Sequence, residues 1–256
     1  MLEWIYRGLS KRRVTTRYPR RPEPAATGFH GCVDVTSALA ADPELATVCP
    51  TGAISVDERG KLSLDRGRCI LCGECVRVAP DVFAFRSSYE SAERSAAALI
   101  VGAENDRLDD GQQVGRAHAE QASMLRHSIH VRHIDCGSDG SEEWEIQALW
   151  NPHYDIQRLG FFLTNSPRHA DVLLVTGPVT APMRAPLERT WEVMPEPKAL
   201  VAVGTDACGG GLHCWGGVDR VLPVDVYVPG SPPSPIAILD GLRLASGQLA
   251  GKALPA

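Results

Sequence analysis

The chain has 256 residues, 44% hydrophobic and 22% charged, and a formal net charge of −5. This length can bury one large core or two small ones. The acidic balance argues against nucleic acid as the main partner, because phosphate binding needs a basic surface. No apolar run approaches the roughly 20 residues that span a bilayer. The N-terminal segment lacks the apolar core of a signal peptide, which favours a cytoplasmic location.

The first 22 residues carry seven Arg or Lys against one Glu, with Trp4, Ile5 and Leu9 between them. This pattern predicts a short basic amphipathic helix. Such a helix can lie on an anionic membrane surface, or it can pack on another subunit. The two interpretations are compatible, and the sequence leaves both open.

Eight cysteines are the most informative feature of the composition. In a reducing compartment, clustered cysteines are metal or redox ligands more often than disulfide partners. The cysteines are Cys32, Cys49, Cys69, Cys72, Cys75, Cys136, Cys208 and Cys214.

Cys69, Cys72 and Cys75 form a C-x2-C-x2-C run, the spacing of bacterial ferredoxins. The fourth cysteine of that motif would stand at Ala79. In two-cluster ferredoxins, the last ligand of this cluster comes from a Cys-Pro pair in the other half of the domain. Cys49, which precedes a proline, supplies that element. The spacing therefore predicts that Cys49, Cys69, Cys72 and Cys75 bind one 4Fe–4S cluster.

A second cluster lacks its ligands. It would need three cysteines upstream of Cys49 and one at Ala79, yet only Cys32 lies upstream. Cys32 is expected to be a buried free thiol. Alternatives for the C-x2-C-x2-C run are a zinc knuckle or a redox-inert loop.

Three regions differ in composition, and we predict domain boundaries from them. Residues 1–85 form a small cysteine-containing domain, residues 86–121 a linker with some helix, and residues 122–256 an α/β domain. In the third region, apolar runs and helical patterns alternate, which favours a parallel sheet. The expected strands are 161–164, 171–176 and 198–203, and the expected helices are 186–193 and 235–245.

Residues 1–85 resemble the ferredoxin-type subunit of respiratory complex I and of group 4 membrane-bound nickel–iron hydrogenases. The resemblance rests on residues 14–19, 49–54 and 69–75. It implies a small α+β ferredoxin-like domain. The family normally carries two clusters in this module, so a single cluster is a departure.

Residues 122–256 resemble the small (B-type, 20 kDa) subunit of the same complexes. The matching segments are 126–138, 166–180, 194–198 and 224–230, followed by Pro232 and Pro233. The resemblance implies a flavodoxin-like α/β domain, here preceded by the ferredoxin-like one. It also implies that Arg168 and His169 face the large subunit, next to the proximal cluster.

That family holds its proximal 4Fe–4S cluster with four cysteines, and this chain has none of them. Asp139, Glu142, Asp206 and Ser231 stand at the corresponding positions. Iron–sulfur clusters prefer soft thiolate ligands, so we predict that the proximal cluster is lost. A rebuilt site that uses other cysteines remains an alternative. The candidates for it are Cys136, Cys208 and Cys214.

The three acids allow three interpretations. Together they could bind a hard cation such as Mg²⁺ or Ca²⁺, relay protons with raised pKa values, or lie solvated in loops that have moved outward. Three histidines, His127, His130 and His133, fall on an expected strand, where side chains alternate between faces, so we interpret them as structural.

These observations predict an iron–sulfur subunit of a hydrogenase-like or complex I-like oxidoreductase complex, peripheral on the inner face of the cell membrane. The expected partners are a large subunit and membrane ion-translocating subunits. Without the proximal cluster, the subunit would mainly dock other subunits and couple ions or protons, rather than deliver electrons to a catalytic site. An alternative is a redox-active subunit of a quinone or ferredoxin oxidoreductase, and a weaker one is a free electron carrier.

Overall fold

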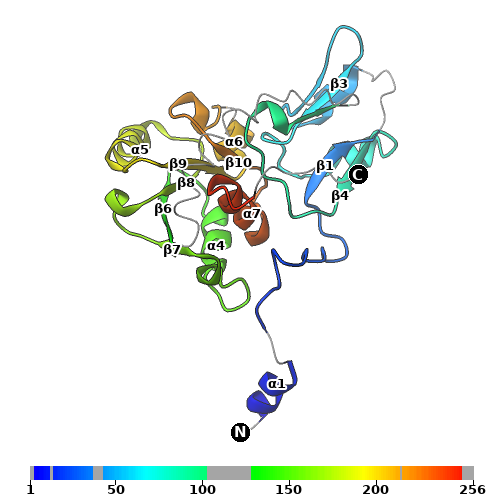
Figure 1. The fold of residues 1–256 in the computed structure, drawn as a ribbon. Coiled ribbons are helices and arrows are strands. Elements are labelled where there is room, and N and C mark those ends of the chain that lie inside the picture. Colours follow the sequence, from blue (N-terminus) through cyan, green and yellow to red (C-terminus); the bar gives the residue numbers. More distant parts are fainter. Residues whose placement is uncertain (1–2, 12–13, 37–42, 103–127, 214, 250–256) are drawn as a thin grey trace.

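The computed structural model describes residues 3–11, 14–36, 43–102, 128–213 and 215–249. These residues form two modules (Figure 1). The smaller, N-terminal module contains two antiparallel sheets, and the larger module is built on one parallel sheet.

Five parallel strands in the order β10-β9-β8-β6-β7 form the sheet of the larger module. All residues of β8 and β9 are buried, as expected for strands covered on both faces. Counted along the chain, the strand order is 2-1-3-4-5, the order of flavodoxin. The predicted fold class is confirmed. The strands are β6 (Ile129–Asp135), β7 (Phe161–Leu163), β8 (Val172–Thr176), β9 (Ala199–Val203) and β10 (Val226–Val228).

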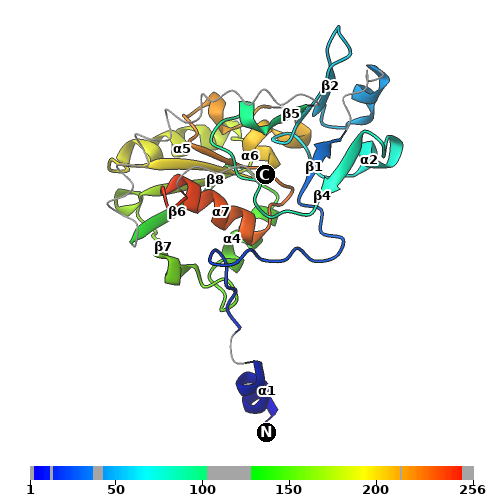
Figure 2. The same ribbon diagram turned by 45° about the vertical axis from the view of Figure 1, so that its right-hand side comes forward.

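Helices cover both faces of this sheet (Figure 2). Residues of α4 (Ser141–Ala148) and α7 (Pro235–Ala245) share one buried apolar cluster with the strands. Residues of α5 (Ala181–Val193) and α6 (Thr205–Gly209) belong to the cluster on the opposite face. Helix α7 has the predicted bounds. Helix α5 begins at Ala181, five residues before the predicted start.

The smaller module pairs β1 (Cys32–Val35) with β4 (Phe83–Arg86) and places β3 between β2 and β5. The bounds are Ile54–Val56 for β2, Leu62–Asp65 for β3, Ile100–Gly102 for β5 and Glu74–Val78 for α2. Strand β5 comes from the expected linker. Residues 100–102 thus complete the second sheet, whereas residues 103–121 lie outside the described part.

Short 3-10 helices connect these elements. They are η1 (Pro43–Val48), η2 (Ala97–Leu99), η4 (Ile156–Leu159), η5 (Pro167–His169), η6 (Gly211–His213) and η7 (Val218–Arg220).

The segment that precedes the small module packs on the larger one. The Thr16 N–H donates to the His153 carbonyl at 2.8 Å. The buried Tyr18 hydroxyl donates to Asp240 of α7 at 3.2 Å. Further along, Glu93 and Tyr227 exchange backbone hydrogen bonds of 2.9 and 2.8 Å. Two separate segments therefore hold the modules together.

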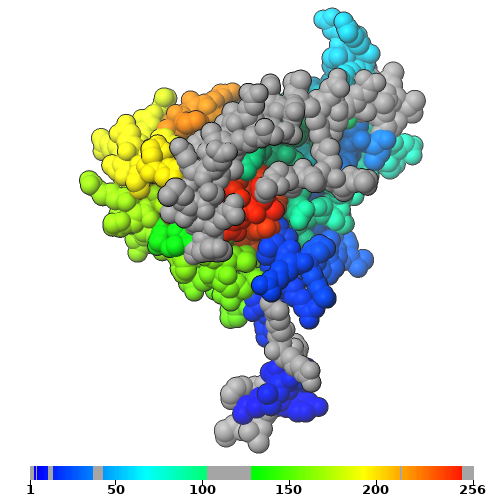
Figure 3. All heavy atoms as spheres, viewed as in Figure 1, coloured from blue at the N-terminus to red at the C-terminus, as the bar shows by residue number. Residues whose placement is uncertain are grey.

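Helix α1 (Glu3–Lys11) lies away from both modules (Figure 3). Ile5, Tyr6 and Leu9 are exposed on it, Tyr6 to 74% and Leu9 to 71%. The acidic Glu3 pairs with Arg7 one turn later at 2.5 Å. Among the helices in the described ranges, none is both long and apolar enough to cross a membrane.

The core of the larger module makes a first prediction. Leu174, in the central strand β8, is fully buried, whereas Leu163, in the edge strand β7, is 52% exposed. Leu174→Ala should lower the free energy of unfolding by about 2–5 kcal/mol, because it leaves a cavity between two helical layers. The matched control Leu163→Ala should cost under about 1 kcal/mol. Equal losses in urea unfolding would contradict this account of the core.

Candidate functional site

The four predicted ligand cysteines surround one cavity in the small module. Cys49 follows η1, Cys69 and Cys72 lie in the loop between β3 and α2, and Cys75 is on α2. All four line the same cavity, together with apolar side chains that include Val33. The structure thus brings together residues 26 positions apart in the sequence, from Cys49 to Cys75.

The cysteine loop is shaped by backbone that glycine favours. Leu71 and Gly73 have positive φ angles of 56° and 78°. A Cβ at Gly73 would lie 3.1 Å from the Phe85 ring, so a side chain there would crowd that ring. The loop can therefore turn tightly beneath β4 and direct its three cysteines to one side.

Burial and hydrogen bonds shift the pKa values of the cysteine thiols in different directions. Burial raises the pKa of Cys69 to about 12, and burial also raises the pKa of Cys75. Burial opposes the thiolate at Cys49 too, but hydrogen bonds from Thr51 and backbone N–H groups outweigh it and lower the pKa. The Ala53 N–H donates to Cys49 Sγ at 3.3 Å. Cys49 is therefore the thiol best prepared to bind as a thiolate.

The four thiols can be compared with what a zinc ion and an iron–sulfur cluster each require. Zinc needs four donors around a single atom, with sulfurs about 2.3 Å from the metal. Across the residues with described positions, no three His, Cys, Asp or Glu side chains come close enough to hold one metal ion. A four-iron cluster keeps its four cysteine sulfurs farther apart, around a cavity. The zinc knuckle and the four-iron cluster both stay predictions.

The remaining cysteines lie elsewhere. Cys32 is buried on β1 and accepts a hydrogen bond from Arg86 Nε at 3.2 Å. Cys136 and Cys208 are buried in the core of the larger module, and Cys214 lies outside the described residues. The structure thus provides no support for a site rebuilt from the last three.

The acids that the resemblance aligns with the proximal-cluster cysteines gather where the parallel strands end. Asp139 and Glu142 follow β6, and Asp206 follows β9. Asp139 raises the pKa of both Glu142 and Asp206, and Asp206 raises the pKa of Glu142. Ser231, after β10, is exposed. Carboxyl ends of parallel strands share one edge of the sheet, which explains the gathering.

Glu142 occupies the inner end of this group. It is only 4% exposed, and its carboxyl group contacts Gly204, where no side chain could fit beside it. Asp139, in contrast, is exposed. The Ser141 hydroxyl lies between them: it donates to Glu142 Oε2 at 3.1 Å and also hydrogen-bonds Asp139. The three acids, all within the described ranges, do not converge closely enough to hold a cation.

Burial is the main cause of the shifted pKa values in this group. Burial, with smaller contributions from the carboxylates of Asp139 and Asp206, raises the pKa of Glu142 to about 7. Burial also raises the pKa of Asp206, which the nearby His213 partly offsets. The prediction of solvated acids therefore holds for Asp139 and is wrong for Glu142.

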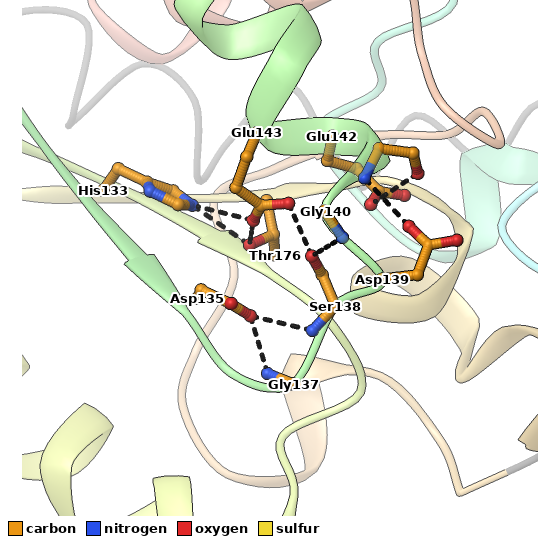
Figure 4. A network of polar contacts seen from close by, with 10 residues as sticks. His133, Asp135, Gly137, Ser138, Asp139, Gly140, Glu142, Glu143 and Thr176 are labelled. Carbon is orange, nitrogen blue, oxygen red and sulfur yellow. Dashed lines mark hydrogen bonds and ion pairs between the residues drawn. The ribbon is translucent and has the colours of Figure 1, made fainter.

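A second polar network beside Glu142 was not predicted from the sequence (Figure 4). Glu143 points from α4 toward β6 and β8, where it accepts hydrogen bonds of 2.5 Å from Thr176 and from Ser138. His133 Nε2 lies 3.3 Å from Glu143. Burial lowers the pKa of His133, although Glu143 acts against this. Only the tertiary structure shows that these strands and α4 meet here.

The other histidines and Arg168 lie apart from this network. His130 lies 3.6 Å from Asp171, away from His133, and His127 falls outside the described residues. Arg168 and His169 are exposed on η5, where β8 begins. This is the opposite edge of the sheet from Asp139, so the expectation that they adjoin the former cluster is wrong.

Thr205 joins the cysteine loop to the acidic edge. Its buried hydroxyl lies 3.0 Å from the Cys69 carbonyl and 3.0 Å from the Gly230 carbonyl, next to Ser231. Gly209 packs against the backbone of Gly67, with no room for a Cβ. The cysteine loop therefore rests directly on α6, which carries Asp206.

The raised pKa of Glu142 predicts how stability depends on pH. An acid with a raised folded-state pKa binds its proton more tightly in the folded state, so stability falls as pH rises from 4.5 to about 7. Glu142→Gln should remove this loss and stabilise the chain by on the order of 2 kcal/mol at pH 8. The gain should shrink toward pH 5. Urea unfolding at both pH values tests this, and a pH-independent effect would contradict it.

Comparisons with known proteins agree with the geometry. The family model described as NADH ubiquinone oxidoreductase, 20 kDa subunit, matches residues 139–245. The chain is 41% identical to formate hydrogenlyase subunit 7 of Escherichia coli, over 55% of this chain and 57% of that protein. It is 42% identical to the probable membrane-bound hydrogenase subunit mbhJ of Pyrococcus furiosus, over 52% of this chain and 82% of that protein.

A B-type NADH-quinone oxidoreductase subunit of Amoebophilus asiaticus is 46% identical, over 38% of this chain and 65% of that protein. The chain thus matches just over half the length of formate hydrogenlyase subunit 7. A flavodoxin-like strand order, a matching family model and a hydrogenase-type relative aligned over most of its length lead to one conclusion. The chain belongs to the family of the 20 kDa subunit of NADH ubiquinone oxidoreductase.

Proposed function

We propose that this chain is an iron–sulfur subunit of a membrane-associated, hydrogenase-like or complex I-like oxidoreductase complex. In this proposal, a ferredoxin-like module is fused to the small-subunit domain, and Cys49, Cys69, Cys72 and Cys75 hold one 4Fe–4S cluster. The observation that carries it is the single cavity lined by these four cysteines. The names of the hydrogenase and quinone oxidoreductase relatives support the assignment to such a complex.

The residues around the cavity suit a cluster that stores one electron when bound. Val33, Ile54 and Leu64 line the cavity and limit the access of water. The N–H donor to Cys49 Sγ stabilises a negatively charged ligand. Cys72 is exposed and Cys69 is buried against the larger module. Electrons would therefore enter the cluster from solvent or a donor near Cys72, and would leave it toward the larger module near Cys69.

The proximal cluster is absent in this proposal. Glu142 fills the space beside Gly204 with a buried carboxyl group, which is a hard ligand and a poor substitute for a thiolate. Ser231, which stands at another of the four positions, is exposed. Without the proximal cluster, an electron at the remaining cluster has no nearby acceptor on the way to a catalytic site in a partner subunit. The main roles of the subunit are then to dock other subunits and to couple ions or protons.

The proposed partners are a hydrogenase-like or complex I-like large subunit and membrane ion-translocating subunits. Trp144, Leu212 and Trp215 are 73%, 61% and 56% exposed. Trp144 lies on α4, which also carries Glu142. Leu212 and Trp215 lie on the segment that follows α6, the helix that carries Asp206. Exposed apolar side chains of this size are typical of protein interfaces. We therefore assign the large subunit to this edge.

A second candidate function is a redox-active subunit of a quinone or ferredoxin oxidoreductase. The contact between Thr205 and Cys69 favours it, because that contact brings the cysteine loop to the edge where a partner would bind. The large subunit distinguishes the two candidates. Loss of its nickel-binding cysteine pairs would favour docking and coupling, and their retention would favour electron transfer.

The cluster assignment predicts iron content. The reconstituted chain should hold about four irons and give one 4Fe–4S electron paramagnetic resonance signal on reduction. Cys72→Ala should lose most of both. The matched control Cys32→Ala should keep both, because Cys32 lies outside the cavity and bonds Arg86. About eight irons and two such signals per chain would contradict the loss of the proximal cluster.

Helix α1 predicts peripheral attachment to a membrane. Its Ile5, Tyr6 and Leu9 side chains are exposed, and the surrounding sequence is basic. The chain should sediment with phosphatidylglycerol vesicles, and Leu9→Glu should reduce the bound fraction several-fold. The matched control Leu212→Glu should bind as well as the unaltered chain. If the unaltered chain stays in the supernatant, α1 contacts protein partners only.

A further inference from the structure

Two consecutive residues at the start of helix α6 connect Glu142 to the cysteine loop. The Glu142 carboxyl group contacts Gly204, and the next residue, Thr205, hydrogen-bonds the Cys69 carbonyl at 3.0 Å. Thr205 is itself 1% exposed. The path between these groups is buried, so charges on its two sides interact through protein of low polarity.

The groups that face Glu142 come from three segments. Asp139 approaches from the loop before α4, and Asp206 lies on α6 with His213 beside it. Buried Cys208, also on α6, lies on the side of the core. None of these groups forms an ion pair with Glu142 in the described part of the chain. The carboxyl group is therefore sensitive to any further negative charge nearby.

Ser141 connects Glu142 to solvent. Its hydroxyl donates to Glu142 Oε2 and also hydrogen-bonds the exposed Asp139. The hydroxyl has one proton, which it can donate to either carboxylate but not to both at once. Ser141 therefore links the buried carboxyl group to an acid that is in contact with bulk water.

We propose that Glu142 takes up one proton when a cluster held by Cys49, Cys69, Cys72 and Cys75 is reduced. This inference rests on the proposed function. A low-potential one-electron reductant supplies the electron, and bulk water supplies the proton from the side of Ser141. The glutamate carboxylate becomes a carboxylic acid, and its new O–H bond balances the added charge. Oxidation of the cluster releases both the electron and the proton.

The physical reason is linkage between two charges. An added electron raises the proton affinity of a nearby buried acid, because like charges repel. Reciprocally, proton binding makes reduction easier. Glu142 titrates near neutral pH before the electron arrives, because its burial raises its pKa to about 7. Reduction should therefore extend its protonated range to higher pH.

The test is the midpoint potential of the cluster, measured by electron paramagnetic resonance on the full reconstituted chain with dithionite as reductant. The potential should be nearly flat below about pH 6 and should fall above about pH 7. One pH unit is a tenfold change in proton activity, so the slope can reach about 59 mV per unit for one electron. Glu142→Gln should give a flat curve.

Glu145→Gln is the matched control, because it removes a carboxylate from the same helix near Tyr154. This variant should keep the slope. A flat curve in the unaltered chain, or an unchanged slope in Glu142→Gln, would overturn the inference. If no cluster signal forms at all, the proposed function fails instead. The iron content of each variant separates these outcomes.

Discussion

The contact between the cysteine loop and helix α6 is the constraint on which the rest of the site depends. Two glycines, Gly67 and Gly209, let the backbones touch, and the buried Thr205 hydroxyl lies between the Cys69 and Gly230 carbonyls. A backbone this close to a neighbour leaves no space for a larger side chain. The cysteine cavity and the acidic edge are therefore held as neighbours, and any charge in one acts on the other.

The acidic edge follows from the fold, which brings together loops that follow different strands. Three carboxyl groups in one buried space would repel strongly. The structure divides them by exposure: Asp139 stays in solvent, Asp206 is partly buried with His213 nearby, and Glu142 is buried with a raised pKa. A thiolate-bound cluster would have placed its own charge here. In the proposed function, acids replace the thiolates at these positions, and the proposed role of Glu142 is to exchange a proton.

Local patterns predicted much of the fold. The apolar runs at β8 and β9 are buried on both faces and were predicted from their residue types alone. The cysteine spacing predicted residues that the structure gathers around one cavity. Strand β5 falls in the expected linker, because its short apolar run fits either a strand or a helix segment and pairing with β3 decides between them. The placement of Tyr18 on α7 was missed because one distant hydroxyl–carboxylate contact leaves no periodic signal.

The sequence by itself determined the parallel α/β class, the four clustered cysteines and the replacement of four family cysteines, because these depend on residue type and spacing. Tertiary structure alone decided that Glu142 is buried while Asp139 is exposed, that Glu143 joins His133, and that Thr205 links the two modules. Burial and contact between distant segments set these properties. The pKa of a carboxyl group depends on the water and charges around it, and those are set by packing.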